Sequence, residues 1–200
     1  MFITLEGGEG AGKSTQAGLL ADALCARGLP VLRTREPGGA PGAECLREML
    51  LSGRIDWSGQ AETMLHFAAR MEHVVKTIRP ALAAGAWVVC DRFYDSTMAY
   101  QGYGLGVDRG FIAALSDLVG LAPDLTLVLD VSRPVAAARL SGRGQPDDRY
   151  ERLNDAFHDR VAEGFRAIAR ARRCVLVDAQ APPAAVHAAV IAAVDRPTIG

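Results

Sequence analysis

The segment Gly7–Ser14 (GGEGAGKS) constrains the fold more than any other part of the chain, because it matches the pattern G-x-x-x-x-G-K-[ST] between an apolar run at 2–6 and a helical pattern that begins at Lys13. Glycines let the backbone curl until its N–H groups converge on phosphate oxygens, and the following helix adds its positive N-terminal end. In such a loop the lysine bridges the β- and γ-phosphates, and the serine hydroxyl ligates magnesium. The motif predicts a nucleoside-triphosphate site. Its predicted residues are Gly7, Gly8, Glu9, Gly10, Ala11, Gly12, Lys13, Ser14 and Thr15.

Short apolar runs alternate with longer helical patterns along the whole chain. The predicted strands are 2–6, 31–34, 87–91, 125–131 and 174–178, and the predicted helices are 13–27, 42–51, 61–84, 109–119, 134–140, 150–171 and 183–194. The strand candidates lack polar alternation, which is typical of strands buried on both faces. We therefore predict an α/β fold in which helices cover both faces of a five-stranded parallel sheet. No repeat or linker divides the chain, so we expect a single domain over 1–200.

Composition narrows the classes of protein to consider. Hydrophobic residues make up 50% of the chain, charged residues 22%, and the formal net charge is −1. These values exclude a disordered chain and argue against a nucleic-acid binder, which usually carries a basic face. The longest apolar stretch, 81–90, is about half of the ~20 residues that a membrane-spanning helix needs. We expect neither a nucleic-acid partner nor a membrane partner.

The cysteines indicate the cellular compartment. The chain has four, Cys25, Cys45, Cys90 and Cys174, and none forms a C-x-x-C pair. We interpret them as small buried residues in a reducing compartment, with no zinc site. The sequence also begins without a basic, apolar leader. We therefore expect a cytoplasmic protein.

Charged residues lie where the predicted strands end. Asp91 and Arg92 close the third predicted strand, and Arg35 follows the second. Ligands bind beyond the carboxyl ends of parallel strands, and the guanidinium fork of arginine suits phosphate. Arg70 lies on a predicted helix, three residues after Phe67. Since no N-K-x-D guanine motif is present, we favour a kinase whose acceptor already carries a phosphate over a GTPase.

Several motifs together resemble one family. They are TREPGG at 34–39, HFAAR at 66–70, DRFYDSTMAYQG at 91–102 and PDLTLVLD at 123–130. With the phosphate loop, and in this order, the set resembles bacterial thymidylate kinase. The resemblance implies a P-loop fold like that of nucleoside monophosphate kinases. It also implies transfer of a phosphoryl group from ATP–Mg²⁺ to dTMP, which yields dTDP and ADP for dTTP synthesis, by a homodimer.

The resemblance also implies roles for individual residues. Arg35 and Arg92 correspond to arginines that grip the acceptor phosphate, and Arg70 to one that contacts both thymine and phosphate. Glu9 corresponds to an acidic residue facing the sugar and metal, and Tyr100 to one that crowds the 2′ position of the sugar. The predicted substrate-binding residues are Arg35, Pro37, Phe67, Arg70, Arg92, Ser96, Thr97, Tyr100 and Gln101, and the predicted metal ligands are Ser14 and Asp91.

One position departs from the family pattern. Many relatives carry the aromatic ring that stacks on thymine one residue earlier, where this chain has His66. We favour Phe67 as the stacking ring, because a residue three positions before Arg70 projects from the same helix face. The alternative is that His66 stacks and Phe67 belongs to the core.

The stretch 139–152 resembles the mobile lid of the family, with glycines at 142 and 144 and arginines at 139, 143, 149 and 152. The phosphate loop has no basic residue between its glycines, so charge in the transition state must be neutralised from elsewhere. We expect Arg143 and Arg149 to do this, one at the phosphates and one at adenine. The predicted catalytic residues are Lys13, Glu9, Arg92, Arg143 and Arg149.

Three other functions stay open at this point. A kinase of dUMP or dCMP would share every phosphate contact and differ only in the base pocket. A deoxynucleoside kinase would not need three arginines around an acceptor phosphate. A nucleotide-dependent switch without turnover would be expected to carry a separate effector domain.

Overall fold

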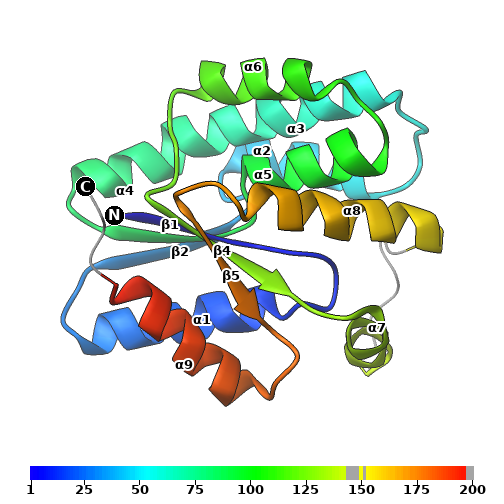
Figure 1. Ribbon diagram of the computed structural model, residues 1–200. Coiled ribbons are helices and arrows are strands. Elements are labelled where there is room, and N and C mark those ends of the chain that lie inside the picture. The colour runs from blue at the N-terminus through cyan, green and yellow to red at the C-terminus, as the bar shows by residue number, and fades with distance from the viewer. Residues whose placement is uncertain (143–148, 151, 197–200) are drawn as a thin grey trace.

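A single parallel sheet forms the centre of the molecule (Figure 1). The computed structural model describes residues 1–142, 149–150 and 152–196. The strands are β1 (Phe2–Glu6), β2 (Val31–Arg35), β3 (Trp87–Asp91), β4 (Leu125–Asp130) and β5 (Cys174–Asp178). They lie in the order β2-β3-β1-β4-β5, and every neighbouring pair is parallel. The predicted five-stranded parallel sheet is confirmed.

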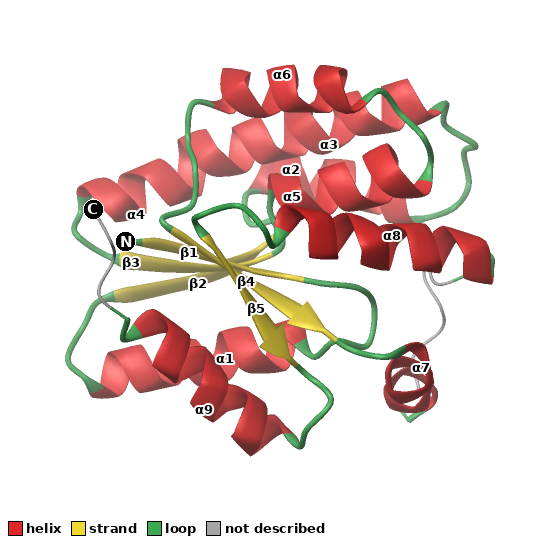
Figure 2. Cartoon of the chain, viewed as in Figure 1, coloured by secondary structure: helices red, strands yellow, loops and turns green. Residues whose placement is uncertain are grey.

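Helices cover both faces of the sheet (Figure 2). They are α1 (Lys13–Ala26), α2 (Pro41–Leu51), α3 (Gly59–His73), η1 (Val74–Ile78), α4 (Arg79–Ala83), α5 (Tyr94–Thr97), η2 (Met98–Gly104), α6 (Arg109–Val119), α7 (Arg133–Ser141), α8 (Asp155–Ile168) and α9 (Pro183–Val194). The side chains of β1 point alternately to the two faces of the sheet and contribute to a hydrophobic cluster on each. Ile3 and Leu5 pack in a cluster with residues of α1 and α9, whereas Phe2 packs in a cluster with residues of η1 and α6. Successive strand side chains point to opposite faces, so one apolar strand serves two layers.

The two edge strands differ from the prediction. The strands were all expected to be buried on both faces, and β1 is indeed buried throughout. In β2, however, Arg33 and Arg35 are exposed, and in β5 Leu176 is 50% exposed. Both strands lie at the edges of the sheet, where the covering layers leave part of the strand open to solvent.

The helical segment η2 was not predicted. The glycines at 102, 104 and 106 indicated a loop, but 94–104 is helical. The glycine at 104 serves close packing instead, because a Cβ atom there would lie 2.4 Å from the Phe157 ring of α8.

The helix α8 begins later than predicted, at Asp155 instead of Tyr150. The side chain of Asn154 caps it by accepting from the backbone N–H of Phe157 at 3.0 Å.

The cysteines are less uniformly buried than expected. Cys90 is buried and Cys174 is half-buried, but Cys25 and Cys45 are exposed, and all four are free thiols.

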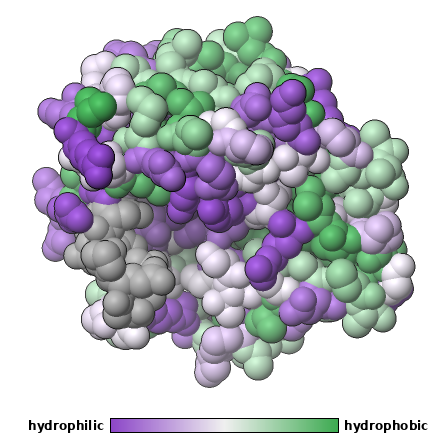
Figure 3. Space-filling model, turned by 180° about the vertical axis from the view of Figure 1, so that it is seen from behind, coloured by the Kyte–Doolittle hydropathy of each residue, from purple (hydrophilic) through white to green (hydrophobic). Residues whose placement is uncertain are grey.

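No helix in the part of the chain that the structure describes is both long and apolar enough to cross a membrane. On the face shown in Figure 3, hydrophilic and hydrophobic residues are interspersed.

Candidate active site

The carboxyl ends of three neighbouring strands meet at one place. Leu5 of β1 and Arg35 of β2 both pair in register with Asp91 of β3. The segments that follow these strands therefore leave the sheet side by side. They line a cavity of about 660 Å³ that runs from the phosphate loop to α3 and η2.

The phosphate loop has the backbone conformation that its sequence predicts. Gly10 has φ of +72°, and a Cβ atom there would lie 2.6 Å from the carbonyl oxygen of Ala136 in α7. Only glycine fits such a position. Lys13 is 6% exposed, and its Nζ donates to the carbonyl oxygen of Gly8 at 2.7 Å. Burial, and then the nearby Arg92, lower the pKa of Lys13.

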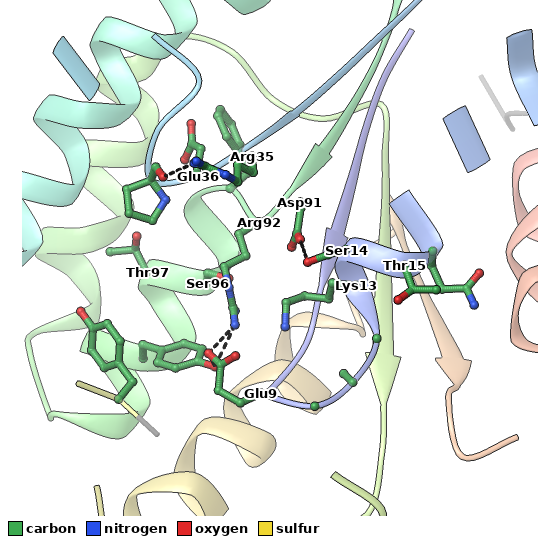
Figure 4. A pocket seen from close by; sticks show the side chains of 18 of the residues that line it. Glu9, Lys13, Ser14, Thr15, Arg35, Glu36, Asp91, Arg92, Ser96 and Thr97 are labelled. Carbon is green, nitrogen blue, oxygen red and sulfur yellow. Dashed lines mark hydrogen bonds and ion pairs between the residues drawn. The ribbon is translucent and has the colours of Figure 1, made fainter. Parts of the chain in front are cut away.

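Ser14 and Asp91 lie next to each other at the cavity (Figure 4), and the serine hydroxyl donates to Asp91 Oδ2. Asp91 Oδ1 is buried and has no hydrogen-bond partner within the described residues. A buried carboxylate oxygen that lacks a donor is suited to a cation. Because magnesium keeps several waters and takes phosphate oxygens, two protein oxygens are enough for it.

Arg92 lies at the centre of the site. Its backbone is left-handed, with φ of 70°, a conformation uncommon for a residue with a side chain. The guanidinium donates to Glu9 Oε1 at 2.5 Å, to the Tyr100 hydroxyl at 3.2 Å and to Ser96 Oγ at 3.1 Å. Figure 4 shows Arg92, Glu9 and Lys13 directed at the same space. Burial opposes the charge of Arg92, but Glu9, Tyr100, Asp91 and Glu6 together outweigh it and raise the pKa of Arg92.

A fully buried acidic side chain, Glu6, supports Arg92. Glu6 accepts from the backbone N–H of Phe93 at 2.7 Å and from Ser96 Oγ at 2.5 Å. Burial, and then the charge of Asp95, raise the pKa of Glu6 to about 8. Ser96 thus joins Glu6 to Arg92, and its hydroxyl is engaged in this role instead of lying free to contact a base.

Arg70 enters the cavity from α3. Its Nε donates to Glu36 Oε2 at 2.7 Å and its Nη2 to Thr97 Oγ1 at 3.1 Å. Glu36 also contacts His73 Nδ1 at 3.0 Å, so the carboxylate is held from two sides. The third nitrogen, Arg70 Nη1, is buried and has no partner among the described residues. This donor is therefore available to a ligand in the cavity.

Arg35 lines the cavity near its opening. Its guanidinium pairs with both carboxylate oxygens of Glu44 of α2, at 3.1 and 3.2 Å. The side chain is 47% exposed, so this pair is weak and screened by solvent. A phosphate that enters the cavity can therefore compete for the arginine at small cost.

The structure places Phe67, the preferred stacking ring, away from the cavity. The Phe67 ring is 6% exposed, packs in the core with Val74 and Ile112, and does not line the cavity. Its face supports the guanidinium of Arg70, at 4.7 Å from the ring centroid. Residues three and four positions before Arg70 both lie on its side of the helix, so spacing alone could not distinguish them. The ring that borders the cavity is His66.

Of the two predicted lid arginines, the structure describes only Arg149. Arg149 does not line the cavity, because its Nη1 lies 2.5 Å from Oε2 of Glu62, a fully buried carboxylate of α3. Arg143 falls outside the described residues. Arg139 of α7 does line the cavity, and it donates to carbonyl oxygens of Gly10 and Ala179 at 3.4 and 2.9 Å.

Most of the predicted site residues come together around the cavity. Those that line it are Glu9, Gly10, Ala11, Gly12, Lys13, Ser14, Thr15, Arg35, Pro37, Arg70, Asp91, Arg92, Ser96, Thr97, Tyr100 and Gln101, whereas Gly7, Gly8, Phe67 and Arg149 do not. The cavity-lining residues that the sequence analysis missed include Gln16, Glu36, Arg47, Tyr150 and Pro183. Glu36 and Tyr150 stand next to predicted residues in the chain, which was the only signal for them. Pro183 comes from the distant start of α9, and no sequence pattern pointed to it.

Comparisons with known proteins agree with this geometry. A family model described as thymidylate kinase matches residues 5–190. A thymidylate kinase of Gluconobacter oxydans is 56% identical, over 97% of this chain and 94% of the relative. Another, of Rhizorhabdus wittichii, is 52% identical over 96% of this chain and 95% of the relative. The crystal structure of thymidylate kinase from Ehrlichia chaffeensis superposes with a TM-score of 0.79 at 37% identity and 98% coverage of both chains. The chain therefore belongs to the thymidylate kinase family.

Proposed function

We propose that this protein transfers the γ-phosphoryl group of ATP to dTMP, producing dTDP and ADP on the route to dTTP. The observation that carries the proposal is one continuous cavity with a phosphate loop at one end, Arg35 and Arg70 at the other, and Arg92 between them. A triphosphate donor and a monophosphate acceptor bound at the two ends would meet at Lys13 and Arg92. Family membership supports the choice of substrates.

The donor end binds phosphate by fixed dipoles and charge. The N–H groups of the glycine-rich loop and the start of α1 present positive partial charge, and Lys13 adds a full one. Its Nζ is held by the Gly8 carbonyl at 2.7 Å and so stays within the loop. Arg139 lines the cavity beside Ala181 and Pro183, where the remainder of the nucleotide has room.

Ser14 and Asp91 would hold Mg²⁺ together with phosphate oxygens and water. The unpartnered Asp91 Oδ1 and the adjoining serine hydroxyl are the oxygen ligands that this ion prefers. When bound, the ion neutralises phosphate charge and helps to orient the donor.

The acceptor end is built to hold a phosphorylated nucleoside. Arg92 is fixed by Glu9 and Ser96, and its position between the two ends suits the phosphoryl group in transit. The buried, unpartnered Arg70 Nη1 suits an acceptor oxygen of the base or its phosphate. Tyr100 packs its ring under the Arg92 guanidinium at 5.0 Å from the centroid, and thereby narrows the space for the sugar.

Catalysis at such a site is mainly positioning and charge neutralisation, because phosphoryl transfer asks little covalent chemistry of the protein. Lys13 and Arg92 lie on either side of the reacting group and offset its negative charge as the bond to the leaving oxygen breaks. Glu9 accepts from both Arg92 and the Tyr100 hydroxyl, and so keeps the arginine aimed into the cavity.

A coupled ADP-release assay tests the proposal. Wild-type protein is assayed with ATP against dTMP, dUMP, dCMP, dGMP, UMP and thymidine, with and without Mg²⁺. We expect strong preference for dTMP and loss of turnover without the ion. Preference for another monophosphate would keep the phosphate machinery and overturn the base assignment, while turnover of thymidine would indicate a nucleoside kinase. ATP binding without turnover of any acceptor would favour a nucleotide-dependent switch.

We further propose that the protein acts as a homodimer in the cytoplasm. Met64, Met71 and Val75 are 50%, 38% and 47% exposed. Their spacing of seven and four residues places them on one side of the continuous helical stretch α3–η1. Exposed apolar residues on one helix face suit a second copy of the chain. The free cysteines support the compartment, since disulfides are rare in the cytosol.

A further inference from the structure

We propose that Glu62 is a positioning residue for the acceptor nucleotide, which fixes the orientation of His66, Gln101 and Tyr150 along the cavity wall. The proposal rests on the proposed function and extends it to a residue that does not itself line the cavity. Its basis is a buried polar cluster centred on the Glu62 carboxylate, which contacts Tyr150 and Gln101 directly and His66 through Tyr150.

The cluster joins three distant parts of the chain. Glu62 of α3 is fully buried. Its Oε1 accepts from Tyr150 at 2.7 Å and from Gln101 Nε2 of η2 at 2.8 Å, while its Oε2 faces Arg149 Nη1 at 2.5 Å. One helical turn along α3, His66 Nε2 lies 2.9 Å from the Tyr150 hydroxyl. A lone carboxylate is costly to bury, so the contacts with Tyr150, Gln101 and Arg149 are the compensation for placing it there.

The proton positions in the cluster follow from its geometry. A carboxylate has no proton to donate, so the Tyr150 hydroxyl gives its single proton to Glu62 Oε1. Toward both of its other neighbours the Tyr150 oxygen is then an acceptor: Gln101 Nε2 donates to it at 3.0 Å, and His66 Nε2, at 2.9 Å, must carry the proton. Burial raises the pKa of Tyr150 well above its ordinary value and lowers that of His66 to about 3. Tyr150 therefore keeps its proton, and His66 is neutral with Nδ1 as an acceptor.

The carboxylate acts on the cavity through these neighbours. Gln101, His66 and Tyr150 all line the cavity, and Tyr150 meets the Tyr100 ring edge-on at 5.3 Å between centroids. Without the anion, Gln101 and Tyr150 lose the acceptor they share, and the guanidinium of Arg149 loses its buried counter-charge. The wall where we place the acceptor base and sugar would then lose its fixed orientation, whereas Lys13 and the phosphate loop are untouched.

Two substitutions test this role. Tyr150→Phe removes one hydroxyl and keeps the ring, and Glu62→Gln keeps the shape and removes the charge. For both, we expect KM for dTMP to rise about tenfold, as for loss of a buried hydrogen-bond partner, with KM for ATP changed less than about twofold. Long-range ¹H–¹⁵N spectra of His66 should show the Nε2-protonated ring in wild type and a mixture of tautomers in Tyr150→Phe. Arg27→Gln is the matched control, because Arg27 forms an exposed ion pair with Asp195.

Each outcome decides the proposal. A KM for dTMP equal to that of wild type in folded Tyr150→Phe would overturn it. Equal rises of both KM values, accompanied by a lower melting temperature, would show a purely structural role and overturn it as well. If Glu62→Gln does not fold, Tyr150→Phe and the His66 spectrum decide alone. Wild-type protein that fails to phosphorylate dTMP would defeat the proposed function, while the His66 tautomer would still report on the cluster.

Discussion

The conformation of Arg92 depends on Glu6, a buried residue that does not line the cavity. The left-handed backbone of Arg92 is followed by Phe93, whose N–H donates to the buried Glu6 at 2.7 Å. The same carboxylate accepts from Ser96, which in turn accepts from Arg92. A strained backbone persists only where its surroundings hold it, and Glu6 supplies two of the contacts that do so.

Glu6 should make the stability of the protein depend on pH. Its pKa is raised from 4.5 to about 8, so between these values the folded state holds a proton that the unfolded chain releases. The stability that protonated Glu6 gives is fully present below pH 4.5 and is lost as pH rises through 8. We expect the free energy of unfolding of wild type to fall relative to Glu6→Gln over this range, by at most about 1.4 kcal/mol per pH unit.

Urea titrations at several pH values measure this difference. Glu163→Gln serves as the control, because Glu163 is exposed on α8, and its difference from wild type should stay constant with pH. A constant difference for Glu6→Gln would show that Glu6 is ionised in the folded protein throughout.

Sequence patterns located single residues well where chemistry depends on a local motif. The loop 7–14 and the pair at 91–92 are motifs whose neighbours in space are also neighbours in sequence. The patterns could not decide whether His66 or Phe67 borders the cavity, because one helical turn offers two positions on the same side and only packing decides between them. Glu62 and Tyr150 lie 88 positions apart, and no local pattern connects a buried carboxylate to so distant a partner.

Among the elements, the strands were the most predictable, because apolar runs bounded by turns have few alternatives in an α/β chain. The segment η2 was predicted wrongly as a loop, because its glycines were interpreted as turn formers. In the structure Gly104 instead permits close contact between η2 and α8. The start of α8 was misplaced for a related reason. Arg149 and Tyr150, which precede α8, bond with Glu62 of α3 and Gln101 of η2, and a tertiary contact of that kind leaves no periodic signature.

The side chain of Arg139 ties the helix α7 to the donor end of the site. Its guanidinium donates to carbonyl oxygens of Gly10, Ala179 and Ala181 at 3.4, 2.9 and 3.2 Å. We expect Arg139→Met to raise KM for ATP about tenfold, since each hydrogen bond from a charged donor contributes about 1.5–3 kcal/mol. KM for dTMP should change less than about twofold, because Arg139 contacts none of the acceptor residues.

Steady-state kinetics with each substrate varied in turn make this measurement. Arg133→Gln is the control on the same helix, because the polar contacts that the structure describes for Arg133 are exposed and all lie on α8: ion pairs with Asp155 and Asp159, and a hydrogen bond to the carbonyl oxygen of Asp155. Equal effects of the two substitutions would mean that α7 matters only as a packed helix.

At the scale of the whole molecule, the stretch from α3 to α4 has two sides with different roles. One side carries Arg70 and His66 to the cavity, and the other leaves Met71 and Val75 exposed. A dimer formed through the second side would brace the helix that positions the acceptor. We therefore expect Met71→Glu with Val75→Glu to convert the protein to a monomer and to lower its turnover of dTMP.

Sedimentation velocity at micromolar concentration measures the assembly state. Wild type should sediment as a dimer. The double variant should sediment as a monomer, because a stable interface buries about 800 Å² on each partner and would not tolerate two added charges at its centre. Leu176→Glu on β5, 50% exposed in wild type, is the matched control and should remain dimeric. A wild type that sediments as a monomer would remove the proposed dimer. A double variant that dimerises as wild type does would place the interface on another face of the molecule.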